Sequence, residues 1–194
     1  MTMGNIDPTA TVHSTASVDP SATVRAGAMI GCKVTVGRNA HVGANAIIQS
    51  GVHVGEYATI RDEAMVGPGA LLGPGSTTGR GARIGPKAEV GTRAVVGDRT
   101  NIGSGSRVSA GALVEQRTTL RRGALVDRGA KVGSRVSVGS HAWIGAGARI
   151  GSRTALGARV VVGSNAEVGH RARLEQGVQI PRNAVVPARA RAVS

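Results

Sequence analysis

Branched aliphatic residues recur at every sixth position of the chain from Ile6 to Val186, and Thr78 is the one exception. A small residue, most often alanine, stands two positions before each of them, and the residue after is most often glycine. Apolar positions two apart face the same side of an extended strand. The three residues that separate one such pair from the next are rich in the Gly, Asn, Asp, Pro and Ser that turn a chain. Each group of six therefore predicts one short strand and one corner. A fixed short period of this kind is typical of a solenoid whose repeats stack on one another.

This six-residue pattern resembles that of the hexapeptide-repeat family: an aliphatic residue, then Gly, Ala, Glu or Asp, and a small residue three positions further on. The resemblance covers nearly the whole chain. It implies an all-β fold, a single left-handed parallel β-helix that is triangular in section, with 18 residues in each of about ten coils and no inserted loops. At a strand spacing of ~4.8 Å, the prism is roughly 48 Å tall.

We expect one domain over residues 1–194. Residues 1–5 form a lead-in, 6–186 form continuous coils with a weak polar coil near 73–80, and 187–194 form a frayed basic tail. No charged region followed by an apolar run is visible at the start of the sequence, so we expect no secretory signal, and no apolar stretch approaches the ~20 residues that span a bilayer. These features, with a single cysteine at Cys32, predict a cytoplasmic protein without membrane insertion.

Charge divides the chain into two unequal halves. Residues 1–78 hold four basic and five acidic side chains, a net charge of −1, whereas residues 79–194 hold twenty basic and six acidic ones, a net charge of +14. The division falls at the polar coil, where Ser76 and Thr78 occupy inward positions. We interpret it as a seam between a neutral and a basic half of one prism, or alternatively as one tolerated polar coil.

An 18-residue period places six arginines above one another, each at the third corner position of its coil: Arg99, Arg117, Arg135, Arg153, Arg171 and Arg189. The two equivalent corners carry arginine at only two of twelve positions. At ~4.8 Å spacing, neighbouring like charges repel by about 0.8 kcal/mol even in water, so such a row costs stability unless an anion binds it. Arginine also offers a planar fork that suits phosphate, sulfate and carboxylate.

The row predicts a site for a linear polyanion: a nucleic-acid backbone, an acidic glycan or an acidic protein surface. No aromatic residues interleave with the arginines, which argues against base stacking and favours contacts to a backbone. The alternative is that arginine merely fills solvated corners.

The hexapeptide family is best known for acyltransferases, and the stretch SHAWIGAGARIGSRTALG (residues 140–157) resembles late coils of its sugar and serine acetyltransferases. That resemblance implies acyl-CoA contacts from Trp143, Gly145, Gly147 and Ala148. The chain departs from those enzymes because it has no inserted loop and no matching catalytic histidine motif. The remaining candidates for a general base at a subunit interface are His41 and His141, against the alternative that both are surface residues.

The five histidines fall in five different rows of the expected prism, and none reproduces the close pair of the zinc-binding γ-class carbonic anhydrases that share the fold. Cys32 stands alone on a corner and adds no second thiolate. We therefore expect no metal and no cofactor, with acetyl-CoA entering only if the acyltransferase interpretation holds.

Most outward positions are polar, but three apolar groups stack at 18-residue intervals: Met29, Ile47 and Met65; Val95 and Leu113; Leu125, Trp143 and Val161. Stacked exposed apolar residues indicate a contact surface. Of the three groups, we expect the last two to form a subunit interface. The family resemblance implies a homotrimer, with a monomer as the alternative.

These features predict a non-catalytic, rigid β-helical scaffold that presents an arginine row to a polyanionic partner. One alternative is a hexapeptide-repeat acyltransferase that uses acetyl-CoA or another acyl donor at a subunit interface. A second alternative is a purely structural, idealised or engineered repeat protein.

Overall fold

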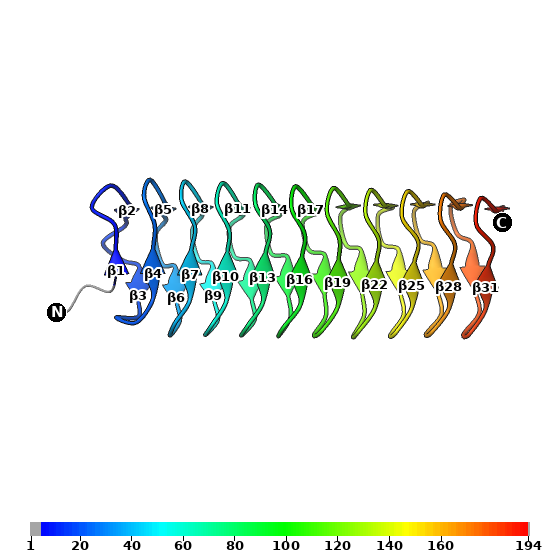
Figure 1. The fold of residues 1–194 in the computed structure, drawn as a ribbon, viewed down its shortest axis with the longest axis horizontal. Coiled ribbons are helices and arrows are strands. Elements are labelled where there is room, and N and C mark those ends of the chain that lie inside the picture. Colours follow the sequence, from blue (N-terminus) through cyan, green and yellow to red (C-terminus); the bar gives the residue numbers. More distant parts are fainter. Residues whose placement is uncertain (1–4, 194) are drawn as a thin grey trace.

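The computed structural model describes residues 5–193 as a solenoid of two-residue parallel strands, in which three sheets run the length of the molecule (Figure 1). Each strand pairs with the strand three places further along the chain. Paired residues are 18 apart, as in Thr59 with Thr77, so 18 residues make one coil. The all-β fold, the coil length and the absence of inserted loops within these residues confirm the predicted architecture.

Sheet A begins the coil. Its eleven strands are β1 (Asn5–Ile6), β4 (Thr23–Val24), β7 (His41–Val42), β10 (Thr59–Ile60), β13 (Thr77–Thr78), β16 (Val95–Val96), β19 (Leu113–Val114), β22 (Lys131–Val132), β25 (Arg149–Ile150), β28 (Glu167–Val168) and β31 (Val185–Val186).

Sheet B follows after one corner. Its eleven strands are β2 (Thr11–Val12), β5 (Met29–Ile30), β8 (Ile47–Ile48), β11 (Met65–Val66), β14 (Arg83–Ile84), β17 (Asn101–Ile102), β20 (Thr119–Leu120), β23 (Ser137–Val138), β26 (Ala155–Leu156), β29 (Arg173–Leu174) and β32 (Arg191–Ala192).

Sheet C completes the coil. Its ten strands are β3 (Ser17–Val18), β6 (Thr35–Val36), β9 (His53–Val54), β12 (Leu71–Leu72), β15 (Glu89–Val90), β18 (Arg107–Val108), β21 (Leu125–Val126), β24 (Trp143–Ile144), β27 (Val161–Val162) and β30 (Gln179–Ile180). We name the three corners AB, BC and CA after the sheets that they join.

The core consists of the second residue of each strand and the small residue two positions before it. From Val24 to Leu174 these aliphatic side chains are almost fully buried, with the alanines between them. At the ends, Ile6 and Val186 are only partly buried because each lies in a terminal coil. The burial follows directly from the six-residue period, because that period puts every aliphatic side chain inside the prism.

Thr78 is the one polar residue in the aliphatic series, and its side chain has no exposed surface. Among the described residues, its Oγ1 is the one fully buried side-chain polar atom without a hydrogen-bond partner. A buried hydroxyl without a partner costs free energy because it gives up its bonds to water. The polar coil near 73–80 thus contains one unsatisfied buried hydroxyl, and its weakness stays a prediction.

Two backbone requirements shape each corner. The first corner residue lies against the next coil, and a Cβ added to Gly85 would lie 2.7 Å from the amide nitrogen of Ser104, so glycine is favoured there. From Gly27 to Arg189, the third residue of every corner has a positive φ, in the left-handed region that glycine and asparagine tolerate best.

The tail does not behave as expected. Instead of being frayed from residue 187, the chain continues the coil, because β32 pairs with β29 and Arg189 donates its N–H to the carbonyl of His170. Of the expected lead-in, residues 1–4 lie outside the described part of the chain. No helix long and apolar enough to cross a membrane occurs within residues 5–193.

Candidate functional site

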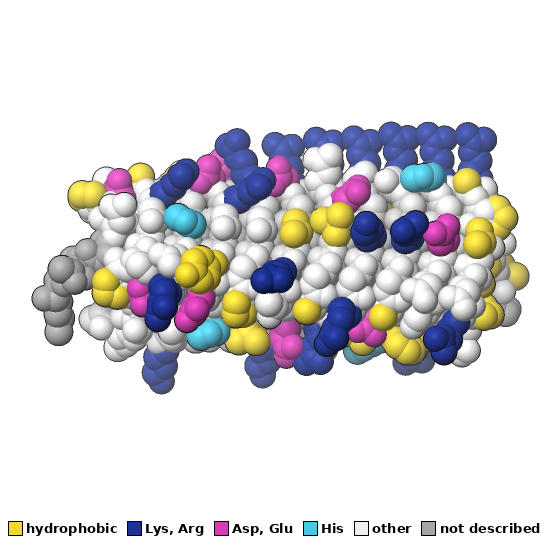
Figure 2. All heavy atoms as spheres, turned by 60° about the horizontal axis from the view of Figure 1, so that its bottom comes forward, with side chains coloured by type: hydrophobic (Ala, Val, Ile, Leu, Met, Phe, Trp, Pro, Cys, Tyr) yellow, Lys and Arg dark blue, Asp and Glu magenta, His cyan; other side chains and the backbone are white. Residues whose placement is uncertain are grey.

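The six arginines predicted to stack do so along corner AB. They occupy the third corner position of successive coils, all are exposed, and their φ angles lie between 54° and 63°. Figure 2 shows the result as a straight line of basic side chains along one edge of the C-terminal half of the prism. We call Arg99, Arg117, Arg135, Arg153, Arg171 and Arg189 the arginine row.

The backbone at these positions disfavours any residue with a Cβ, since the left-handed region costs roughly 1 kcal/mol or more for an L side chain. At the twelve equivalent positions of corners BC and CA from residue 87 onward, six residues are glycine and two are asparagine. Only two are arginine, Arg93 and Arg159. The enrichment of arginine therefore belongs to corner AB and does not follow from the backbone.

No carboxylate lies within 4.0 Å of a row guanidinium in the part of the chain that the structure describes. The basic residues on the neighbouring faces differ in this respect. Arg149 on sheet A pairs with Glu167 at 3.3 Å, and Arg191 on sheet B pairs with Glu175 at 2.6 Å. The flanking charges are thus partly neutralised while the row itself is not.

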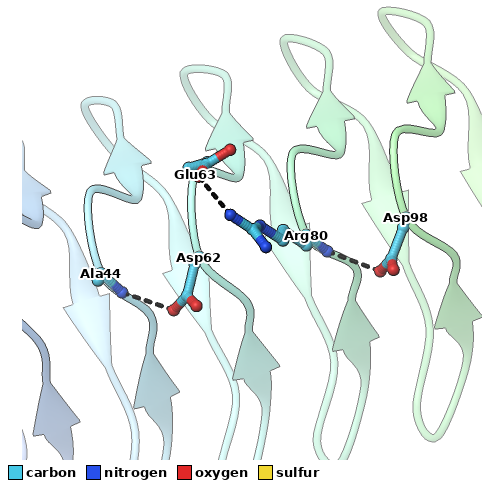
Figure 3. A network of polar contacts seen from close by, with 5 residues as sticks. All are labelled: Ala44, Asp62, Glu63, Arg80 and Asp98. Atoms are coloured by element: carbon cyan, nitrogen blue, oxygen red, sulfur yellow. Dashed lines mark hydrogen bonds and ion pairs between the residues drawn. The ribbon is translucent and has the colours of Figure 1, made fainter.

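The N-terminal half of corner AB carries mixed charges that pair with one another (Figure 3). Arg80 Nη2 lies 2.8 Å from Glu63 Oε1, and Arg61 reaches Asp98 at 3.8 Å. Asp98 also accepts the N–H of Arg80, and Asp62 accepts the N–H of Ala44 in the same way. The hydrogen bond that Arg80 donates to Glu63, and then the negative charge of Glu63, raise the pKa of Arg80 above its ordinary value.

All five histidines are exposed, at outward or corner positions. His41 lies on β7, beside a hollow of about 500 Å³ on sheet A that Arg25, Arg61 and Asp98 also line. His141 lies on corner BC, where its ring covers Gly123 of the preceding coil. At His170, Nδ1 accepts the N–H of Ser152 at 3.0 Å, which leaves only Nε2 of that ring free.

No group of three or more His, Cys, Asp or Glu side chains within residues 5–193 is placed to hold a metal ion.

The four residues expected to contact acyl-CoA are separated by the fold. Trp143 points outward from β24 and is 42% exposed, and Gly147 is exposed on corner CA. Ala148 has no exposed surface because it belongs to the inward series, and Gly145 is buried beneath the corner of the next coil. The Ala148 side chain therefore does not reach the surface, and the acyl-CoA contacts expected from these four residues stay a prediction.

A hollow of about 370 Å³, which was not among the predicted sites, lies on sheet B beside corner BC. Short outward side chains at Ser137 and Ala155 form its floor, and the longer Arg121, Arg173 and Arg191 surround it. We call it the sheet B hollow. Its walls include Ser140 and Gly157, the two ends of the stretch that resembles acetyltransferase coils.

The sheet B hollow is basic. Arg191 is paired with Glu175, which also lines the hollow, but no carboxylate of residues 5–193 pairs with Arg121 or Arg173. Two uncompensated guanidinium groups beside a floor of small residues suit a ligand that carries phosphate or carboxylate groups. An 18-residue alignment of the coils shows Ser137 and Ala155 between longer neighbours, and this signal was available in the sequence.

The predicted apolar groups do stack in register. Trp143 pairs with Leu125 on one side and Val161 on the other, on sheet C. Val95 pairs with Leu113 on sheet A, and Met29, Ile47 and Met65 pair in turn on sheet B. Of these side chains, Met29, Met65, Val95 and Trp143 are substantially exposed. The indole of Trp143 lies near corner BC, since it follows His141 by two residues.

Two family models match parts of the chain. The model described as bacterial transferase hexapeptide (six repeats) matches residues 33–68, and the model described as hexapeptide repeat of succinyl-transferase matches residues 130–188. No sequence among curated proteins matches the chain.

Among solved structures, LpxA from Acinetobacter baumannii matches 91% of this chain and 68% of its own, with a TM-score of 0.63 and 18% identity. This likeness confirms the left-handed β-helix. A histidine-to-asparagine mutant of perosamine N-acetyltransferase from Caulobacter crescentus, in complex with CoA and GDP-perosamine, matches 55% of this chain, with a TM-score of 0.51 and 25% identity. The chain spans about half of that enzyme, 52% of its length.

Proposed function

Because this chain is built from hexapeptide repeats and folds as a left-handed β-helix, we propose that it is an acyltransferase that takes its acyl group from CoA or a similar thioester donor. The repeats that match are those of transferases, over residues 33–68 and 130–188. A structural neighbour with 25% identity is an acetyltransferase in complex with CoA. A fold alone does not define an activity, so the proposal depends on a site in this chain.

The observation that carries the proposal is the position of the sheet B hollow. The stretch of residues 140–157 resembles acetyltransferase coils, and its two ends line a basic hollow of about 370 Å³. We place the donor there, with Arg121 and Arg173 facing its phosphate groups. The thioester end would lie toward corner BC, where Ser140 and His141 are adjacent.

His141 is the residue that we propose as general base. It would accept a proton from the acceptor hydroxyl or amine as that oxygen or nitrogen bonds to the thioester carbonyl carbon. When the carbon–sulfur bond breaks, His141 would return the proton to the departing sulfur. No hydrogen bond to another of the described residues orients the imidazole in one subunit.

A second subunit would supply what one subunit lacks. We propose a homotrimer in which Leu125, Trp143 and Val161 of sheet C pack against a neighbour. Trp143 lies two residues from His141, so this contact would bring the neighbour to corner BC. The neighbour would then cover the sheet B hollow, exclude water and hold the imidazole.

The test compares His141→Asn with His41→Asn, a matched exposed histidine on sheet A. We expect CoA and acetyl-CoA to raise the melting temperature of the wild type and of both histidine variants. With acetyl-CoA and a panel of amino- and hydroxy-sugars, His141→Asn should release thiol at least about a hundredfold more slowly than wild type, and His41→Asn should not.

Arg121→Ser with Arg173→Ser should abolish the thermal shift by CoA. If neither CoA nor acetyl-CoA changes the melting temperature of the wild type, or if His141→Asn retains full thiol release, the acyltransferase proposal is wrong.

A second candidate function is a non-catalytic scaffold that presents the arginine row to an anionic partner. The observation that favours it is the row itself, six exposed arginines in one line with no carboxylate within 4.0 Å among residues 5–193. Binding of a polyanion by a protein that does not bind CoA would favour this function over acyl transfer.

A further inference from the structure

We propose that the arginine row is a binding site for an extended, linear acidic polysaccharide that carries a carboxylate or sulfate on each sugar. This inference rests on the second candidate function and names its partner. It does not depend on acyl transfer, because the row lies on corner AB and the sheet B hollow lies beside corner BC.

The row is not explained by folding. Its members hold a left-handed backbone at which glycine and asparagine are the residues that cost least, and corners BC and CA use glycine or asparagine at eight of twelve equivalent positions. A bias toward arginine throughout the chain would have filled all three corners alike. The restriction to corner AB indicates that the positive charge there serves something outside the chain.

The positive charge of the row is also not paired with carboxylates of the described residues. On the flanking faces, Arg149 and Arg191 have carboxylate partners in Glu167 and Glu175. The row arginines have none within 4.0 Å in the described residues. A guanidinium group binds carboxylate or sulfate with two parallel hydrogen bonds, so each row arginine can take one anionic group of a ligand.

The shape of the row selects the ligand. Six arginines on successive coils span five strand spacings, or roughly 24 Å, in a straight line (Figure 2). A β-(1→4)-linked chain of six-membered sugar rings is extended, and each sugar lengthens it by a distance close to the spacing of adjacent strands. One acidic group per sugar therefore gives the ligand about the same charge per unit length as one arginine per coil gives the row, and about six sugars fill the row.

Nucleic acid fits this line less well. A strand of duplex DNA completes a turn in about 34 Å, so over a row of roughly 24 Å it turns through about two thirds of a circle and leaves the line. Single strands are usually held by aromatic side chains on which bases stack. The chain has one Trp and one Tyr, and Trp143 lies on sheet C while Tyr57 lies on corner CA.

The experiment measures binding of fluorescently labelled polymannuronate oligomers of two to ten sugars, with heparin oligomers as the sulfated probe, duplex DNA as the nucleic acid and dextran as the neutral control. The row variant carries Arg117→Asn, Arg135→Asn and Arg153→Asn. The matched control carries Lys87→Asn, Arg93→Asn and Arg159→Asn, which removes the same charge from the same left-handed backbone position on the other two corners. Asparagine suits this backbone, and Asn45, Asn165 and Asn183 already occupy it.

We expect affinity for an acidic oligomer to rise with length up to about six sugars and then level off. By the counter-ion scaling known for nucleic acids, six contacts predict roughly a thousandfold loss of affinity between 50 and 200 mM salt, and the three contacts left in the row variant predict about a fortyfold loss. The matched control should keep the wild-type salt dependence.

Three results would overturn the proposal. One is that neither acidic oligomer binds better than dextran at 50 mM salt. Another is that the row variant and the matched control lose affinity equally, which would mean that net charge alone governs binding. The third is that duplex DNA binds through the row more tightly than either glycan. Binding to CoA is not measured, so failure here leaves the acyltransferase proposal untouched.

Discussion

The two halves of corner AB have the same backbone but opposite charge arrangements. From Gly27 to Gly81, the third corner residues are Gly, Asn, Glu and Gly, and the corner holds the paired Glu63, Arg80 and Asp98. From Arg99 to Arg189, every third corner residue is arginine, and none has a carboxylate within 4.0 Å in the described residues. The φ angles of these third corner residues are alike in both halves, at 55° to 65° from Gly27 to Gly81 and at 54° to 63° from Arg99 to Arg189.

The contrast separates what the fold requires from what it permits. The third corner residues of both halves adopt the left-handed backbone, so this position requires only a residue that tolerates that conformation and faces solvent. Paired surface charges contribute little to stability, and unpaired like charges in a line oppose it. The N-terminal half can therefore be explained by solubility and local pairing. In the C-terminal half, no carboxylate among the described residues offsets the like charges of the row, and this is the basis for our proposal of an external anion.

The largest effect on stability is expected at the boundary between the halves. Thr78→Val replaces a fully buried hydroxyl that has no hydrogen-bond partner with a methyl group of the same size. We expect the free energy of unfolding to rise by about 1–2 kcal/mol, since the cost of the unsatisfied group disappears. Urea denaturation of wild type and variant measures this.

Thr118→Val is the matched control, because Thr118 is equally buried but donates its hydroxyl to the carbonyl of Gly133 at 2.8 Å. Its loss should lower the free energy of unfolding by about 1 kcal/mol. If both variants shift stability in the same direction, Thr78 is not a point of weakness, and the two halves meet in an ordinary coil.

Most of the fold was predictable because the six-residue period assigns every strand and every inward side chain. The arginine row was equally predictable, since an 18-residue coil fixes which corner residues stack. Partners of long side chains were not: Arg61 reaches Asp98 two coils away, and no sequence spacing fixes that rotamer. The sheet B hollow depends on Ser137 and Ala155 lying side by side between longer neighbours.

Two predictions depend on the alternation of inward and outward positions. The family resemblance implied cofactor contacts from Ala148 and Gly145, and the six-residue period places the Ala148 side chain inside the prism. The tail was expected to fray, but β32 pairs with β29, and Ala192 lies at an inward position beside Leu174.

A smaller effect on stability should come from repulsion between the arginines of the row, and it should depend on the salt concentration. In the absence of ligand, the row variant with Arg117→Asn, Arg135→Asn and Arg153→Asn should be more stable than the control with Lys87→Asn, Arg93→Asn and Arg159→Asn. Both relieve the same backbone cost, but only the first removes neighbouring like charges, for a difference of about 1 kcal/mol at low salt. Melting temperatures at low and high salt measure it, and the difference should shrink at high salt. If the difference in melting temperature between the two variants is the same at low and high salt, charge repulsion within the row does not affect stability.

The smallest effect concerns pH, and it should appear only at the N-terminal end. The Asp7 carboxylate on corner AB accepts the N–H and the hydroxyl of Thr9 at 2.9 and 2.6 Å, and Asp19 does the same for Ser21. These hydrogen bonds lower the pKa of both carboxyl groups below the ordinary value of 3.8. A lowered pKa contributes stability that is present above pH 3.8 and is lost as the pH falls through the lowered value.

The double variant Asp7→Asn with Asp19→Asn should therefore melt below wild type at about pH 7, and the two should converge as the pH falls through the lowered pKa values and both carboxylates become protonated. Arginine stays charged across this range, so the difference between the row variant and wild type should not change with pH at constant ionic strength. A melting difference between this double variant and wild type that does not shrink as the pH falls below 3.8 would mean that these side chains act by packing rather than by charge. The contrast along corner AB would then rest on the arginine row alone.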